Sequence, residues 1–97
     1  MTLDPLSLLT LDASMQSPEA PHTICAEIAQ FLGRPISETD LRETFRSLEA
    51  LGLVKATGSG PHGPPNDVWF VATHVGRETV DREWDLVFPG KGRESDT

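Results

Sequence analysis

Residues 36–54 read Ile-Ser-Glu-Thr-Asp-Leu-Arg-Glu-Thr-Phe-Arg-Ser-Leu-Glu-Ala-Leu-Gly-Leu-Val, and this stretch predicts a helix with both ends marked. Ser37 is a good N-cap, and Asp40 three residues later completes a variant of the capping box. Four apolar residues then recur at helical spacing and predict one buried stripe: Leu41, Phe45, Leu48 and Leu51. Gly52 is suited to end the helix, because glycine adopts a positive φ without a Cβ clash. The helix is therefore expected to run directly into an extended segment beginning at Leu53.

The chain before this stretch predicts a first helix from about Pro5 to Met15. Asp4 is a good N-cap, and proline is favoured at the first helical position. Leu8 and Leu11 form a second apolar edge on this helix, beside its main apolar face. This edge indicates either packing on two sides within the domain or a dimer contact.

A second helix is expected after Pro18 and Pro21, which break the chain, with Thr23 as its N-cap. Its core stripe falls at i, i+4, i+7 and i+8 and consists of Ile24, Ile28, Phe31 and Leu32. Gly33 ends this helix, and a short turn leads to the next one, which is the pattern of a helix-turn-helix. We interpret Cys25 as a small apolar packing residue.

A β-hairpin is predicted after the central helix. Its strands are Val54–Ala56 and Val68–Ala72, the second of them rich in β-branched and aromatic residues. Residues 57–66 between them are mostly glycine and proline and carry no formal charge, as expected of a loop. Thr73 ends the second strand and caps a last helix that stops at Phe88-Pro89-Gly90. The apolar stripe of that helix is Val80, Trp84 and Val87.

The expected order is helix, helix, helix, strand, strand, helix. We therefore predict a mainly α, α+β fold: a winged helix-turn-helix with three helices, a two-stranded wing and a C-terminal helix. The domain is expected to span residues 1–90, followed by a disordered polar tail at residues 91–97.

Two motifs resemble the bacterial winged-helix regulators of the MarR and PadR type. Leu48–Val54, Leu-Glu-Ala-Leu-Gly-Leu-Val, is similar to the end of their recognition helix. Phe70–Glu78, Phe-Val-Ala-Thr-His-Val-Gly-Arg-Glu, resembles the junction between their wing and the following helix. The likeness spans roughly Asp4–Trp84. It implies a homodimeric transcriptional regulator that binds operator DNA with its third helix and wing.

The bulk properties suit one small domain, since the chain has 97 residues. No apolar run approaches the roughly 20 residues that span a bilayer. The first charge is acidic, at Asp4, so we expect no secretory signal and a cytoplasmic protein.

The single cysteine excludes an intrachain disulfide, and it has no metal-ligand spacing to the three histidines, which are His22, His62 and His74. We expect no metal, no cofactor and no enzymatic activity, since no catalytic constellation has a recognisable setting.

Five residues are candidates for contact with double-stranded DNA. Arg42 and Arg46 lie four apart on one outward face of the central helix, and arginine to guanine is the commonest specific base contact. Thr39, near the start of that helix, is placed to contact a phosphate or a thymine methyl group. Arg34 in the preceding turn and Lys55 at the base of the wing are candidate phosphate contacts.

Acidic residues on the same helix allow another interpretation of the two arginines. Glu38 precedes Arg42 by four residues, and Glu49 follows Arg46 by three. Such pairs are typical of a solvated helix, and each contributes about 0.3–0.5 kcal/mol.

The formal net charge of -7 opposes DNA binding, because Lys and Arg contacts to phosphate supply most of the non-specific affinity. A second hypothesis is therefore an acidic winged-helix module that meets a basic protein partner and binds no nucleic acid. Its binding surface is the uncharged wing or the acidic run on the last helix, which we otherwise expect to be a solvated face: Glu78, Asp81, Glu83 and Asp85. Trp69 and Trp84 are expected in the core.

The last expectation concerns assembly. Five apolar residues at the two ends of the folded region are expected to form one exposed patch: Leu3, Leu8, Leu11, Val87 and Phe88. Burial of apolar surface contributes roughly 25 cal/mol per Å², and a symmetric dimer is the commonest way to achieve it. We therefore predict a homodimer formed through the first and last helices.

Overall fold

The computed structural model describes residues 2–57 and 68–90 of the chain. The elements in these ranges are, in chain order, α1 (Pro5–Ala13), α2 (Pro21–Leu32), α3 (Glu38–Ala50), β1 (Val54–Ala56), β2 (Phe70–Ala72) and α4 (His74–Val87). This order is the predicted one. Most of the predicted wing loop and the whole of the predicted tail, residues 91–97, lie outside the described residues.

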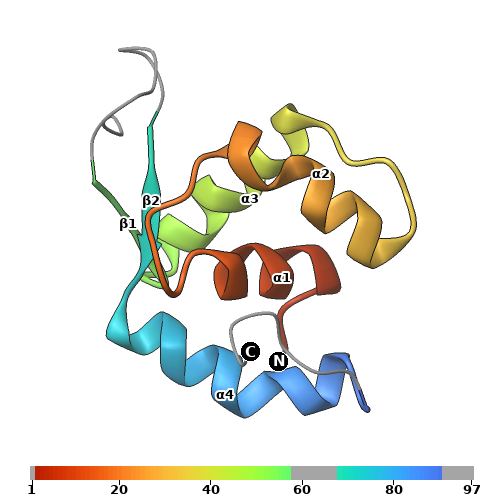
Figure 1. The fold of residues 1–97 in the computed structure, drawn as a ribbon. Helices are drawn as coiled ribbons and strands as arrows, with labels where there is room; N and C mark the ends of the chain where they lie inside the picture. Colours follow the sequence, from red (N-terminus) through yellow and green to blue (C-terminus); the bar gives the residue numbers. More distant parts are fainter. Residues whose placement is uncertain (1, 58–67, 91–97) are drawn as a thin grey trace.

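Helix α1 occupies the centre of the molecule, with α2 and α3 on one side of it and α4 on the other (Figure 1). It ends at Ala13, two residues earlier than predicted. Because three helices pack around α1, both Leu8 and Leu11 are completely buried. The second apolar edge of α1 is therefore explained by packing within the domain.

The predicted exposed patch at the ends of the folded region is wrong. Besides the two α1 leucines, Phe88 belongs to the buried core, and Leu3 and Val87 pack against it.

Within the described ranges, no helix is long and apolar enough to cross a membrane.

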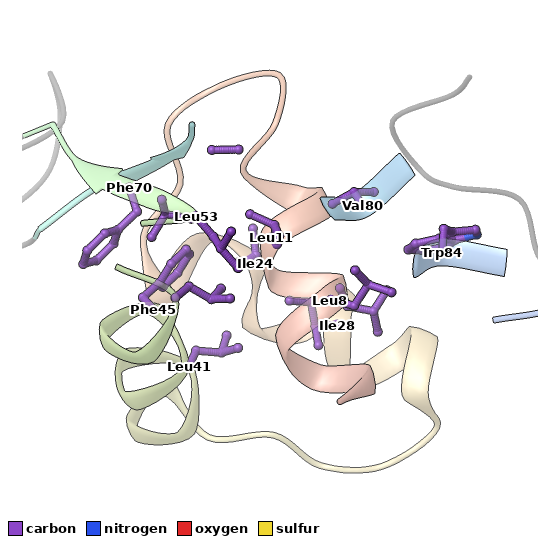
Figure 2. Packing of buried hydrophobic residues seen from close by; sticks show 14 of the residues in the cluster. Leu8, Leu11, Ile24, Ile28, Leu41, Phe45, Leu53, Phe70, Val80 and Trp84 are labelled. Carbon is purple, nitrogen blue, oxygen red and sulfur yellow. The ribbon is translucent and has the colours of Figure 1, made fainter. Parts of the chain in front are cut away.

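The core draws side chains from all four helices and from the hairpin (Figure 2). Phe45 of α3 and Phe70 of β2 stack face to face with ring centroids 4.6 Å apart. Trp84 of α4 contacts Phe88 at 4.8 Å between ring centroids. Leu51 is the exception to the predicted stripe on α3, since it follows the last helical residue and is 63% exposed.

Helix α2 begins at Pro21, so the prediction that Thr23 caps it is wrong. Proline is favoured at this first helical position because its missing N–H has no intrahelical partner there. Thr23 occupies the third position instead, and its hydroxyl accepts a hydrogen bond from the Ala20 N–H at 3.1 Å. Gly33 ends the helix as predicted, with a φ of 72°.

The two strands pair in antiparallel register, with Lys55 opposite Val71. The second strand begins at Phe70, two residues later than predicted. Its other edge is joined by Glu19, whose N–H and C=O exchange backbone hydrogen bonds of 2.8 and 2.7 Å with Phe70. Trp69 lies before the strand and is only half-buried, which corrects its predicted place in the core.

Gly76 in the first turn of α4 packs against the backbone at the end of the α3–β1 connection. A Cβ at this position would overlap the Leu53 carbonyl oxygen and lie 3.0 Å from Leu11 Cδ1. Thr73 caps α4 as predicted: its Oγ1 accepts from the Gly76 N–H at 3.1 Å and donates to the Gly52 carbonyl at 2.7 Å. The Thr73 N–H also donates to the Leu53 carbonyl at 2.9 Å.

We predict that Gly76→Ala destabilises the protein by about 1–3 kcal/mol, because the added methyl group forces the packed backbones apart. The free energy of unfolding is measured by urea denaturation. Val75→Ala is the matched control, since Val75 is the neighbouring residue and is 54% exposed, and its effect should stay within about 0.5 kcal/mol. Equal stability of the two variants would contradict the packing described for Gly76.

Candidate nucleic-acid interface

The start of α3 is held by a reciprocal pair of hydrogen bonds. The Ser37 Oγ accepts from the Asp40 N–H at 3.0 Å, and the Asp40 Oδ2 accepts from the Ser37 N–H at 3.2 Å. This confirms the predicted capping box, with Asp in place of the usual Glu or Gln. At the other end, Gly52 has a φ of 77°, and the Leu53 N–H donates to the Leu48 carbonyl at 2.9 Å. Both ends of the helix that carries the candidate arginines are therefore defined by local bonds.

The turn before α3 is tied to α2 by Cys25. Its Sγ donates to the Ile36 carbonyl oxygen at 2.8 Å. Burial raises the pKa of the Cys25 thiol, and the carboxylates of Glu38 and Asp40 raise it further. The thiol therefore keeps the proton that this hydrogen bond requires, and we interpret the residue as a structural link.

All five candidate DNA contacts are exposed: Arg34, Thr39, Arg42, Arg46 and Lys55. Two of them are brought together, because Arg42 and Arg46 line one hollow between α2, α3 and the segment leading into β2. The remaining three lie outside this hollow, on the turn before α3, on its first turn and on β1.

The hollow has a cavity volume of about 150 Å³, and its lining consists of Pro21, His22, Glu38, Arg42, Arg46, Val68 and Phe70. We call it the Arg42–Arg46 hollow. Its Phe70 is held from three directions: by stacking on Phe45, by pairing with β1 and by the two hydrogen bonds to Glu19. The part formed by β2 is consequently fixed by the core of the protein.

The two arginines do not form the ion pairs that the sequence allows. In residues 2–57 and 68–90, no carboxylate oxygen of Glu38 lies within 4.0 Å of Arg42, and none of Glu49 within 4.0 Å of Arg46. The interpretation of these side chains as partners in helix ion pairs is therefore wrong. Their guanidinium groups remain available to an external anion.

Sequence reasoning did not place His22 and Phe70 in this site. Both reach it through the Glu19–Phe70 pairing, which joins segments about fifty residues apart and leaves no periodic signal. His22 also meets Trp69 edge to face, with ring centroids 5.8 Å apart. The one local signal is Pro21, which marks the start of α2 and so sets where His22 lies.

The acidic run on α4 is not one solvated face. Glu83 is only 5% exposed, and its Oε1 accepts a hydrogen bond from the Leu3 N–H at 2.6 Å. Glu78, Asp81 and Asp85 are exposed, as expected. One of the four carboxylates thus fastens the N-terminal segment to α4.

The helix-turn-helix of α2 and α3, followed by an antiparallel hairpin and α4, defines a winged-helix domain. Neither a family model nor a curated protein matches the sequence. Among solved structures, the chain is similar to a PadR family transcriptional regulator from Eggerthella lenta DSM 2243, with a TM-score of 0.65 and 22% identity over 88% of this chain and 76% of that one. It is also similar to a transcriptional regulator from Clostridium thermocellum, with a TM-score of 0.67 and 20% identity over 84% and 81% of the two chains. These likenesses confirm the predicted winged-helix fold.

We predict that Ser37→Ala lowers the free energy of unfolding by about 1 kcal/mol, because the first turn of α3 loses its cap. Chemical denaturation measures this change. Ser47→Ala, at an exposed position within α3, is the matched control and should be neutral or slightly stabilising, since alanine is the better helix former. If the two serines respond alike, the cap contributes nothing to the placement of α3.

Proposed function

We propose that the protein is a small transcriptional regulator that binds double-stranded DNA, with α3 in the major groove and the wing beside it. The observation that carries this proposal is the pair Arg42 and Arg46. Both are exposed on α3, both face the hollow beside β2, and neither is held by a carboxylate of its own helix in the described part of the chain. A winged helix-turn-helix places its recognition helix in the major groove, where arginine contacts bases and phosphates.

Two further points support the proposal. The two similar solved structures are described as transcriptional regulators, one of them of the PadR family. Arg34, Thr39 and Lys55 are exposed around α3 and on the hairpin, so they are accessible to a DNA backbone. We assign them as outer contacts, which add affinity without belonging to the hollow.

The alternative of an acidic module with a basic protein partner has less support. One of the four carboxylates of its proposed surface on α4, that of Glu83, is buried in the protein. The remaining exposed carboxylates are interrupted by Arg82, whose Nη2 lies 3.4 Å from Glu83 Oε2. This alternative becomes the favoured one only if the protein binds no DNA.

We predict that the protein binds a random-sequence DNA duplex at low salt and that added salt weakens the binding. Replacing Arg42 and Arg46 together by alanine should reduce the affinity at least tenfold and lower the slope of log K against log salt by about 0.9 per lost phosphate contact. Fluorescence anisotropy at several salt concentrations measures both quantities.

Arg82→Ala is the control for the loss of one positive charge outside the hollow, because Arg82 lies on α4 and does not line the hollow. It should leave the affinity within about twofold of the wild type. Absence of binding to every duplex at low salt would refute the proposed function. A pull-down that then returns a basic protein would favour the interaction module.

We also propose that the protein is a homodimer, paired through the outer face of α4. Val75 and Leu86 are 54% and 69% exposed. They lie eleven residues apart, about three helical turns, and so share one face of α4. This face replaces the patch expected from the sequence, whose five residues lie in the core or pack against it.

We predict that Leu86→Glu converts a dimer into a monomer, because a charge on the dimer face must be desolvated. Light scattering at micromolar concentration measures the mass. Leu51→Glu is the control, since Leu51 is equally apolar and 63% exposed but lies at the end of α3; this variant should keep the dimer mass. A monomeric wild type would remove the dimer and the expectation of a palindromic operator.

A further inference from the structure

The Arg42–Arg46 hollow differs in charge from the rest of α3. The helix carries four carboxylates against two guanidinium groups, and its sequence is Glu-Thr-Asp-Leu-Arg-Glu-Thr-Phe-Arg-Ser-Leu-Glu-Ala. In the hollow the balance reverses, because both arginines line it and Glu38 is the one carboxylate among the residues that line it. An anion that approaches α3 is therefore favoured in the hollow and opposed elsewhere along the helix.

The position of the arginines on α3 also matters for what they reach. At about 100° per residue, Arg42 lies to one side of the buried stripe, and Arg46 lies between Arg42 and the outermost residues, Thr39 and Glu43. That side faces the hollow formed with Val68 and Phe70. A base edge deep in the major groove is met by the outermost residues of a recognition helix, so Arg42 is better placed for the DNA backbone that flanks the groove. Arg46 lines the same hollow as Arg42 and can share its anion.

The imidazole of His22 also lines the hollow, and it becomes positively charged when it takes up a proton. Histidine changes its charge between about pH 5 and 8. Protonation raises the formal charge of the lining from one to two positive units, counting the two arginines and Glu38.

We propose that the Arg42–Arg46 hollow seats one phosphodiester group of the DNA backbone, held by the two guanidinium groups, and that His22 strengthens this contact when it is protonated. The proposal rests on the proposed function and assigns Arg42 and Arg46 to backbone contact. It adds His22 to the DNA interface. Planar guanidinium groups bind phosphate oxygens in a bidentate manner, which suits two arginines one helical turn apart.

The groups around His22 determine the direction of the pH dependence. From α3, the charged side chains that line the same hollow are Arg42, Arg46 and Glu38. From its own segment, the Glu19 carboxylate accepts hydrogen bonds from the Ser17 and Thr23 hydroxyls. The Trp69 ring, whose centroid lies 5.8 Å from that of the imidazole, adds no charge. A phosphate bound in the hollow is negatively charged and therefore favours the protonated form of the His22 imidazole. Binding then takes up a proton, so the affinity for DNA rises as the pH falls.

The first test separates backbone contact from base contact. Arg42→Ala and Arg46→Ala are titrated separately against several unrelated duplexes at a series of salt concentrations. Each variant should weaken binding to all duplexes by a similar factor and lower the salt slope by about 0.9. A variant that changes the preference among duplexes and keeps the wild-type slope would identify a base-reading arginine and overturn the assignment.

The second test uses the pH. Wild-type protein should bind a random duplex roughly three- to tenfold more tightly at about pH 5.5 than at about pH 7.5, the effect of one added charged contact. His22→Gln should lose this dependence, and His22→Lys should bind tightly at both pH values. His74→Gln is the matched control, because His74 is exposed on α4 and pairs with Glu78 at 2.9 Å. It should keep the wild-type dependence.

Retention of the full pH dependence by His22→Gln would remove His22 from the interface. Circular dichroism of each variant verifies the fold, which an exposed residue such as His22 should not affect. A protein that binds DNA with an unchanged slope and pH profile in these variants refutes this inference alone. A protein that binds no duplex refutes the proposed function as well, so the two failures are distinguishable.

Discussion

The structure depends on the close approach of Gly76 to the Leu53 carbonyl oxygen. At this point the end of α3 with β1, the start of α4 and the centre of α1 meet, because Leu53, Thr73, Gly76 and Leu11 are all in contact there. The two motifs that carry the resemblance to winged-helix regulators, Leu48–Val54 and Phe70–Glu78, are the two sides of this one contact. Neither motif lies in the hollow except through Phe70. They specify how α3 and the wing are joined, which is a requirement of the fold, and they leave the binding surface free to vary.

The sequence predicts the fold best where structure follows from local bonds. Both ends of α3 are predicted correctly, because the Ser37 cap and the Gly52 turn depend only on residues within four positions along the chain. The predicted start of α2 is wrong because Pro21 begins the helix, whereas the sequence predicts a break there. The periodicity of apolar residues does not distinguish these two roles of proline. The burial of Leu8 and Leu11 depends on the positions of three other helices, so the sequence alone does not decide between packing within the domain and a dimer contact.

The candidate site likewise has one part that local sequence predicts and another that depends on contacts between distant segments. Helical spacing places Arg42 and Arg46 on one side of α3, and the structure agrees. The ion pairs that the sequence allows, and that are absent among the described residues, depend on side-chain directions that spacing does not define. His22 belongs to the site only because α2 begins close to β2, which follows from the backbone pairing of Glu19 with Phe70. A contact between distant segments of this kind has no signature in a single sequence.

The net charge of -7 describes the whole chain, whereas the proposed DNA interface is one face of it. Beyond the contact at Gly76, helix α4 lies across α1 from α3 (Figure 1), and packed helices are about 8–10 Å apart, so a layer of helix separates the hollow from most of the carboxylates on the outer side of α4. At physiological ionic strength the Debye length is about 8 Å, and these charges are largely screened at the hollow. Glu43 and Glu49 on α3 itself are near enough to act. In the proposed interface these carboxylates oppose the long-range attraction that speeds association of basic proteins with DNA, so the proposed binding relies on short contacts made after encounter.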